Sequence, residues 1–143
     1  MRAKLVNENI LLPKSNKDIL KDLKRLSPNE MLLKSSEKGF IEGVKLALEQ
    51  GADIHTDEDE ALKWAIDKGH IEVVKLLIKN GANIHTGDDY ALRYAAQNGH
   101  IEVVKLLIKN GANIHAVDDY ALRWAAEQGH LEVVNLLKKH MKR

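Results

Sequence analysis

One seventeen-residue block, GHIEVVKLLIKNGANIH, occurs twice without a change, from Gly69 to His85 and from Gly99 to His115. Self-similarity at a period of about 20 to 50 residues is typical of solenoids and related repeat architectures. Apolar residues inside the block recur at helical spacing, which predicts a helix with a wide apolar stripe. Gly111 supplies the left-handed conformation in which many helices end. Because so apolar a helix needs neighbours on more than one side, the block predicts stacked helices.

The same 30-residue period extends over most of the chain. Four units align on equivalent turn glycines, which are Gly39, Gly69, Gly99 and Gly129. The units span about 28–57, 58–87, 88–117 and 118–143. Each unit should contain a first helix of about ten residues, a glycine turn and a second helix of similar length. The predicted fold class is therefore all-α, a solenoid of four stacked helix-turn-helix units.

Residues before the first unit are predicted to form two parts. Residues 1–15 contain apolar side chains without a clean period and form a loosely ordered leader. Ser15 precedes a helical pattern as an N-cap, which predicts a short capping helix over 16–26. Ser27, Pro28 and Glu30 then have the order of a capping box and mark the start of the first unit.

Both ends of a solenoid need a polar outer face. The helix at 16–26 is expected to cover the first unit. In the last unit, Lys138 stands where the earlier second helices carry Ile78 and Ile108, so this helix is expected to close the stack. The repeat domain as a whole would span 16–143.

Two phrases of the units can be compared with known repeats. Gly-His-Ile-Glu-Val-Val-Lys-Leu-Leu-Ile followed by Gly-Ala-Asn-Ile is similar to the second helix and exit of ankyrin repeats, and Ala95-Ala96 resembles the small pair of their first helix. Tyr90-Ala91-Leu92-Arg93 stands where that family usually has Thr-Pro-Leu-His, and the period is 30 in place of about 33. Since the missing residues fall where the family builds a protruding finger, the inter-repeat loops should be short. The Asp-Asp-Tyr-Ala-Leu-Arg-Trp-Ala-Ala phrase resembles repeats of large DNA viruses and phages.

The resemblance implies a protein-protein interaction module without enzyme activity, an adaptor or inhibitor whose concave face and loop edge bind a partner. A viral origin and a host target would fit it. By the same resemblance, partner binding falls on loop positions and on the ends of first helices: Asp59, Asp89, Asp119, Asp67, Lys68, Gln97, Asn98, Glu127 and Gln128.

Acidic residues cluster where each first helix is predicted to begin. They are Asp57, Glu58, Asp59, Glu60, Asp88, Asp89, Asp118 and Asp119. We expect them to cap the helices and to interact favourably with the positive helix ends. Stacked in this way they would also form an acidic edge that steers a partner with a basic patch.

Six histidines recur every fifteen residues, from His55 to His130. Equivalent residues in stacked units are separated by about 8–10 Å. Ligands of one zinc ion must each lie about 2 Å from it, so the period predicts no metal site. Instead, His70, His100 and His130 are expected to fasten the turn between two helices through ring-to-backbone hydrogen bonds. The histidines at 55, 85 and 115 should line the loops.

Trp64, Tyr94 and Trp124 share one register of the first helix, beside Lys63, Arg93 and Arg123. Such a pattern could stack on single-stranded bases. An aromatic ladder between units is the favoured interpretation, because the basic excess lies in residues 1–26 and not on the repeats. Nucleic-acid binding therefore stays a weaker alternative. Another is an engineered or structural repeat protein without a natural ligand, suggested by the identical blocks.

Catalytic and targeting motifs are not visible. All four serines precede residue 37, ahead of the near-identical units, and the sequence has no Gly-x-Ser-x-Gly, P-loop or dinucleotide-binding pattern, so neither catalytic residues nor a cofactor are predicted. Cysteine is absent, which suits a reducing compartment. No apolar run has the length of a signal peptide core or a membrane span. We expect a soluble, cytoplasmic protein that makes no membrane contact and is a monomer.

Overall fold

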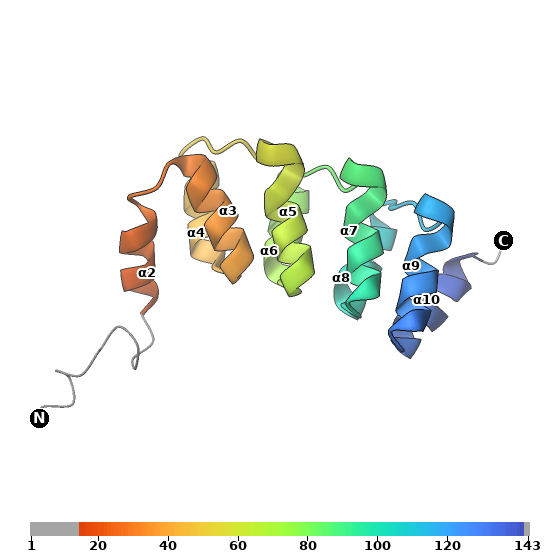
Figure 1. Ribbon diagram of the computed structural model, residues 1–143. Coiled ribbons are helices and arrows are strands. Elements are labelled where there is room, and N and C mark those ends of the chain that lie inside the picture. Colours follow the sequence, from red (N-terminus) through yellow and green to blue (C-terminus); the bar gives the residue numbers. More distant parts are fainter. Residues whose placement is uncertain (1–14, 142–143) are drawn as a thin grey trace, which may run out of the picture.

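The computed structural model describes residues 15–141, and every regular element among them is a helix. Helix α2 spans Asn16–Leu23, and four helix pairs follow it. The pairs are α3 (Pro28–Lys38) with α4 (Ile41–Glu49), α5 (Thr56–Lys68) with α6 (Ile71–Lys79), α7 (Thr86–Gln97) with α8 (Ile101–Lys109), and α9 (Ala116–Glu127) with α10 (Leu131–Met141). Figure 1 shows them side by side in one row, in chain order. The predicted all-α solenoid of four units is confirmed.

The two helices of each pair lie in different layers of the stack. The first helices, α3, α5, α7 and α9, pack against one another more extensively than the second helices do. Figure 1 shows the first helices together on one side and the second helices behind them. Since the second helices are splayed apart, the stack is curved, with the first helices on its concave face and the second helices on its convex face.

Small side chains let the first helices approach closely, and larger ones fill the space behind them. Ala65, Ala95 and Ala125 are completely buried in equivalent positions. The second helices contribute valine and leucine to the same continuous core, among them Leu77 and Leu107, both fully buried. Each such leucine contributes roughly 1.5–3 kcal/mol by leaving water. No helix pair has this core alone, because its walls come from the neighbouring pairs.

Helix α2 begins as predicted but ends earlier. The Ser15 hydroxyl accepts the Asp18 N–H at its start, and Leu23, only 5% exposed, anchors it in the core. The helix ends at Leu23 and not at the predicted residue 26: residues 24–26 form a turn that leads into the extended Ser27 before Pro28. The rest of the predicted leader, residues 1–14, lies outside the described residues.

The capping box at the start of α3 is confirmed. The Glu30 carboxylate accepts the Ser27 N–H at 3.0 Å, and the Ser27 hydroxyl accepts the Glu30 N–H at 3.2 Å. The exit loops, residues 50–55, 80–85 and 110–115, contain turns and no strand. The protruding finger is therefore absent, as the short period predicted.

Three residues within the first turn of each of α5, α7 and α9 have left-handed backbone. They are Asp57–Asp59, Gly87–Asp89 and Val117–Asp119, with φ between 52° and 66°. Right-handed helix therefore begins at residues 60, 90 and 120, two residues after the predicted starts. Left-handed backbone costs about 1–2 kcal/mol per residue, although aspartate tolerates it better than most. Side chains of the surrounding structure must therefore hold these turns.

Arginine side chains hold two of the left-handed turns. The Arg93 guanidinium donates to the carbonyls of Asp88 at 3.0 Å and Gly87 at 2.8 Å. Arg123 makes the same pair of bonds to Asp118 at 2.8 Å and Val117 at 3.1 Å. A guanidinium suits this task because its donors form a rigid fork. The Tyr-Ala-Leu-Arg phrase thus ends in a residue that supports the shortened loop.

The histidines after the turn glycines connect neighbouring units. The His70 ring lies against Gly39, and its Nε2 is 2.9 Å from the Glu37 carbonyl oxygen. His100 lies against Gly69 in the same way, with Nε2 3.3 Å from the Asp67 carbonyl oxygen. The ring-to-backbone bonds predicted for His70 and His100 are present, but they reach the preceding unit and do not fasten the turn within one unit. For His130 the structure shows the same approach of the ring to a glycine, Gly99.

We predict that replacing Gly69 by alanine destabilises the protein more than the same change at Gly129. Both glycines are left-handed, with φ of +74° and +77°, so both variants should lose about 1–2 kcal/mol. Only at Gly69 would the new Cβ lie 2.8 Å from the His100 ring, whereas Gly129 has nothing within 4 Å. The clash should add about 1–3 kcal/mol in urea unfolding. Equal losses would contradict the contact between units.

Candidate binding surface

The predicted acidic edge contains both buried and exposed carboxylates. Asp59 and Asp89 are only 4% and 5% exposed. Asp59 accepts the Asn83 N–H at 2.7 Å and lies 3.0 Å from His55 Nδ1. Asp89 accepts the Asn113 N–H at 2.7 Å. Each carboxylate ties the start of a first helix to the exit loop of its own unit.

These contacts correct two predictions. Asp59 and Asp89 were expected to cap their own helices and to bind a partner, but their carboxylates are buried against the exit loop and the loop histidines. Asp119 makes only part of this arrangement: its side chain is 41% exposed and lies 2.7 Å from His115 Nδ1. The edge remains acidic through other residues, all exposed: Asp57, Glu58, Asp88 and Asp118.

A spacing in the sequence could have revealed the buried carboxylates. Asp59 and Asn83 are 24 residues apart, and so are Asp89 and Asn113. In the first unit, Asn29 takes the same place and its side chain accepts the Asp53 N–H at 2.7 Å. Each unit therefore pairs one polar side chain with the amide 24 residues later in the exit loop. This recurring pair distinguishes the buried Asp59 and Asp89 from the exposed residues beside them.

Two of the predicted residues at the ends of the first helices bind the next unit. The Tyr90 hydroxyl donates to Asp67 at 2.8 Å, and the Tyr120 hydroxyl donates to Gln97 at 2.7 Å. Burial, followed by the bond to Asp67, raises the pKa of Tyr90 above its ordinary value, so the hydroxyl stays a donor. The remaining residues of that prediction are exposed: Lys68, Asn98, Glu127 and Gln128.

A row of aromatic rings crosses the first helices of the last two units. We define the ring row as Tyr90, Tyr94, Tyr120 and Trp124. Successive ring centroids are 4.2, 5.7 and 5.8 Å apart. The predicted ladder of Trp64, Tyr94 and Trp124 was wrong in its membership, because Tyr120 stands between Tyr94 and Trp124.

Cations lie over the rings of this row. Arg93 lies 4.8 Å from the Tyr120 centroid and 5.4 Å from that of Tyr94. Lys63 lies 5.4 Å from the Tyr90 centroid and joins the row from α5. Cation-π contacts of this kind contribute about 0.5–1 kcal/mol each at exposed sites. The concave face therefore presents partly exposed rings in fixed positions.

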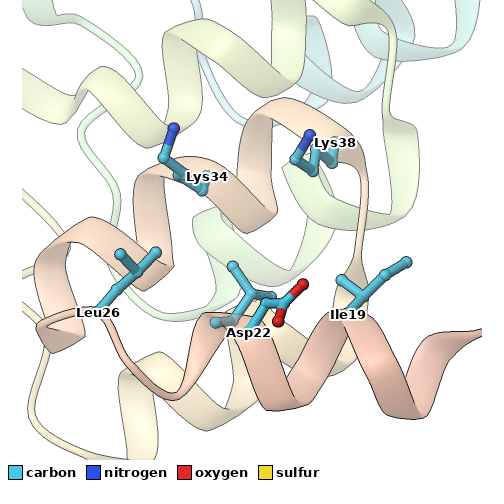
Figure 2. A pocket seen from close by; sticks show the side chains of 6 residues that line it. Ile19, Asp22, Leu26, Lys34 and Lys38 are labelled. Carbon is cyan, nitrogen blue, oxygen red and sulfur yellow. The ribbon is translucent and has the colours of Figure 1, made fainter. Parts of the chain in front are cut away.

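Two hollows flank α3. Trp64 lines the smaller one, about 220 Å³, together with Glu30, Leu33, Lys34 and Glu37. The larger is an open groove of about 470 Å³ between α2 and α3. Its lining residues are Ile19, Asp22, Leu23, Leu26, Lys34 and Lys38, most of them labelled in Figure 2.

The convex face differs in character. Lys75 pairs with Glu72 at 3.4 Å and Lys105 with Glu102 at 3.5 Å, and all four side chains are more than half exposed. Exposed pairs of this type contribute about 0–1 kcal/mol. This face is a solvated surface, so the aromatic concave face is the better candidate for binding.

The model of the ankyrin repeats family matches residues 62–108 and 92–137, which together are 76 of the 143 residues. The chain belongs to the ankyrin-repeat family. The resemblance inferred from the Gly-His-Ile-Glu-Val-Val phrase is confirmed. Ankyrin repeats generally act as protein-protein interaction modules and typically have no enzyme activity. A comparison with curated proteins gave no match. None of the helices in residues 15–141 is both long and apolar enough to cross a membrane.

We predict that Asp89→Ala costs this ankyrin-repeat protein about 1.5–3 kcal/mol, because the Asn113 N–H then loses a charged acceptor that is buried in the wild type. Asp119→Ala is the matched control, since both aspartates are left-handed, with φ of 57° and 58°. Because Asp119 is more exposed than Asp89, Asp119→Ala should lower the free energy of unfolding by at least about 1 kcal/mol less than Asp89→Ala does. Urea unfolding measures both losses. A larger loss at Asp119 would show that the exit-loop bond does not stabilise the repeat.

The loop histidine His55 should make stability depend on pH. Its hydrogen bond to Asp59, with the charge of the same carboxylate, raises its pKa above the ordinary 6.5. The protonated contact therefore stabilises the fold below about pH 6.5, and this contribution is lost as pH rises through the folded pKa. We expect His55→Ala to lower the free energy of unfolding more at about pH 5.5 than at about pH 8.5. A larger effect at the higher pH would contradict this sign.

Proposed function

We propose that this ankyrin-repeat protein is an adaptor or inhibitor that binds a partner protein along its concave face. The observation that carries the proposal is the ring row with its cations. Tyrosine, tryptophan and arginine are the residues that most often dominate the energy of protein interfaces. Here they are gathered on one face, whereas the convex face carries exposed lysine-glutamate pairs, among them Lys75-Glu72 and Lys105-Glu102.

The geometry of the row favours tight recognition. Arg93 is held by two carbonyls, and Tyr90 and Tyr120 are held by bonds from their hydroxyls to the preceding unit. Binding therefore requires little further ordering of these side chains, and the entropic cost of association is reduced. The exposed residues Lys68 and Asn98 stand at the ends of α5 and α7 and extend the surface.

The loop edge adds charge to the proposal. Its exposed carboxylates, Asp57, Glu58, Asp88 and Asp118, replace the buried Asp59 and Asp89 as the groups that could steer a partner with a basic patch. A viral origin with a host target remains an expectation of the sequence resemblance. Single-stranded nucleic acid is the competing ligand, because Arg93 beside Tyr94 and Tyr120 could also stack on bases.

Two charge-reversal variants of the second repeat separate the faces. Lys63→Glu with Lys68→Glu changes the concave side, and Lys75→Glu with Lys79→Glu makes the same charge change on α6 of the convex side. We expect immobilised wild-type protein to capture a partner from nuclease-treated lysate of the source cells. The concave variant should capture about tenfold less and the convex variant as much as wild type, since removing a central interface contact costs about 1.4 kcal/mol or more.

Mass spectrometry identifies the captured protein, and thermal melting checks that both variants are folded. Equal loss with both variants, or retention by the concave variant, would refute binding through the concave face. Capture from untreated lysate but not from nuclease-treated lysate would favour the nucleic-acid alternative.

A further inference from the structure

The groove between α2 and α3 has an apolar side and a cationic side. Figure 2 shows Ile19 and Asp22 of α2, with Leu26 of the following turn, on one wall of the groove. Lys34 and Lys38 of α3 lie on the other wall. Both lysines are exposed, whereas Ile19 and Leu26 are only partly buried. The groove thus leaves aliphatic surface in contact with solvent beside two positive charges.

Charge is distributed unevenly between this end and the remainder of the structure. Residues 15–38 contain six lysines and arginines against four acidic residues, whereas residues 39–141 contain eleven against sixteen. The groove therefore lies at the basic end of a molecule whose repeats are acidic. A cationic rim around an apolar floor attracts anionic segments and disfavours cationic ones.

We propose that this groove is a second docking site, which binds an acidic segment of a protein partner that carries aliphatic side chains. The aliphatic groups would cover Ile19 and Leu26, and the carboxylates would reach Lys34 and Lys38 on the opposite wall. Asp22 also lines the groove, on the α2 side. The volume of about 470 Å³ and the open form suit a few residues of an extended or helical segment.

Charge argues against the two occupants that the protein itself could supply. Residues 1–14 contain Arg2, Lys4 and Lys14 against Glu8, so this segment would bring positive charge to the lysine wall. A second copy docked through the same end would set one basic surface against another. An acidic segment of another protein meets neither of these repulsions, because its charge is opposite to that of the lysine wall. The site does not depend on the ring row, whose residues belong to other units.

Short synthetic peptides test the site on the full-length protein by NMR. The probe has glutamate and leucine in pairs (EELLEELL), and its controls exchange the acids for lysine (KKLLKKLL) or the leucines for serine (EESSEESS). We expect the first peptide to shift the methyl signals of Ile19 and Leu26 and the amide signals of Lys34 and Lys38. The two control peptides should bind at least about tenfold more weakly, because each lacks one of the two interactions.

Charge reversal on the lysine wall provides the second arm. Lys34→Glu with Lys38→Glu should weaken binding of the first peptide about tenfold or more. Lys75→Glu with Lys79→Glu, an exposed pair at the same spacing on α6, should leave it unchanged, and melting curves check that both variants are folded.

Three results would overturn the proposal: no shift in the groove, equal binding of the lysine peptide, or shifts confined to the ring row. Dodecanoate, a fatty acid, serves as a further probe. If it shifts the NMR signals of the groove residues and the peptide EELLEELL does not, the proposal is overturned in favour of a site for a lipid carboxylate. Each of these results leaves the test of the concave face standing, because that test uses other residues.

Discussion

Contact between neighbouring repeats is the condition on which the rest of this structure depends. A single helix pair has an apolar face that it cannot cover, and ordering its residues costs about 1.5 kcal/mol each. Burial of Leu77 and Leu107 between layers and close packing at Ala95 supply the compensation. The turn glycines serve the same contact, because the His100 ring occupies the space that a side chain at Gly69 would need. Stability is therefore a property of the stack.

The short period places a second constraint on the chain. With fewer residues between units, the backbone enters each later first helix through a left-handed turn. Its cost is offset by side chains from both directions: Asp89 accepts the exit-loop amide of Asn113, and Arg93 donates to the turn carbonyls. The residues that distinguish these repeats from the usual ankyrin pattern are thus the ones that hold the shortened loop.

Contacts between units also fix the side chains of the concave face. Tyr90 and Tyr120 reach across to the preceding unit through their hydroxyls, and their rings remain partly exposed in the row. Arg93 supports the loop with its donors while its planar group lies near two rings. Under the proposed mode of binding, structural and recognition roles would fall on the same side chains, because a solenoid forms its surface from the residues that join its units.

Sequence alone determined the fold class, the four units, the capping box and the shortened loops, because these follow from local patterns: apolar spacing, turn glycines and the order Ser27, Pro28, Glu30. It also identified Tyr94, Trp124 and Arg93 of the concave face, but neither Tyr90 nor Tyr120 of the ring row. It could not assign each charged residue to the inside or the outside. Asp88 and Asp89 are adjacent and chemically identical, yet Asp88 is exposed whereas Asp89 is buried, with only 5% of its surface exposed. The left-handed turn directs Asp89 at the Asn113 amide, 24 residues away.

The place of Tyr120 in the ring row also depends on the tertiary structure. Neighbouring first helices lie close enough for its ring to stand between Tyr94 and Trp124. Such contacts join residues far apart in the chain, so only the tertiary structure decided them.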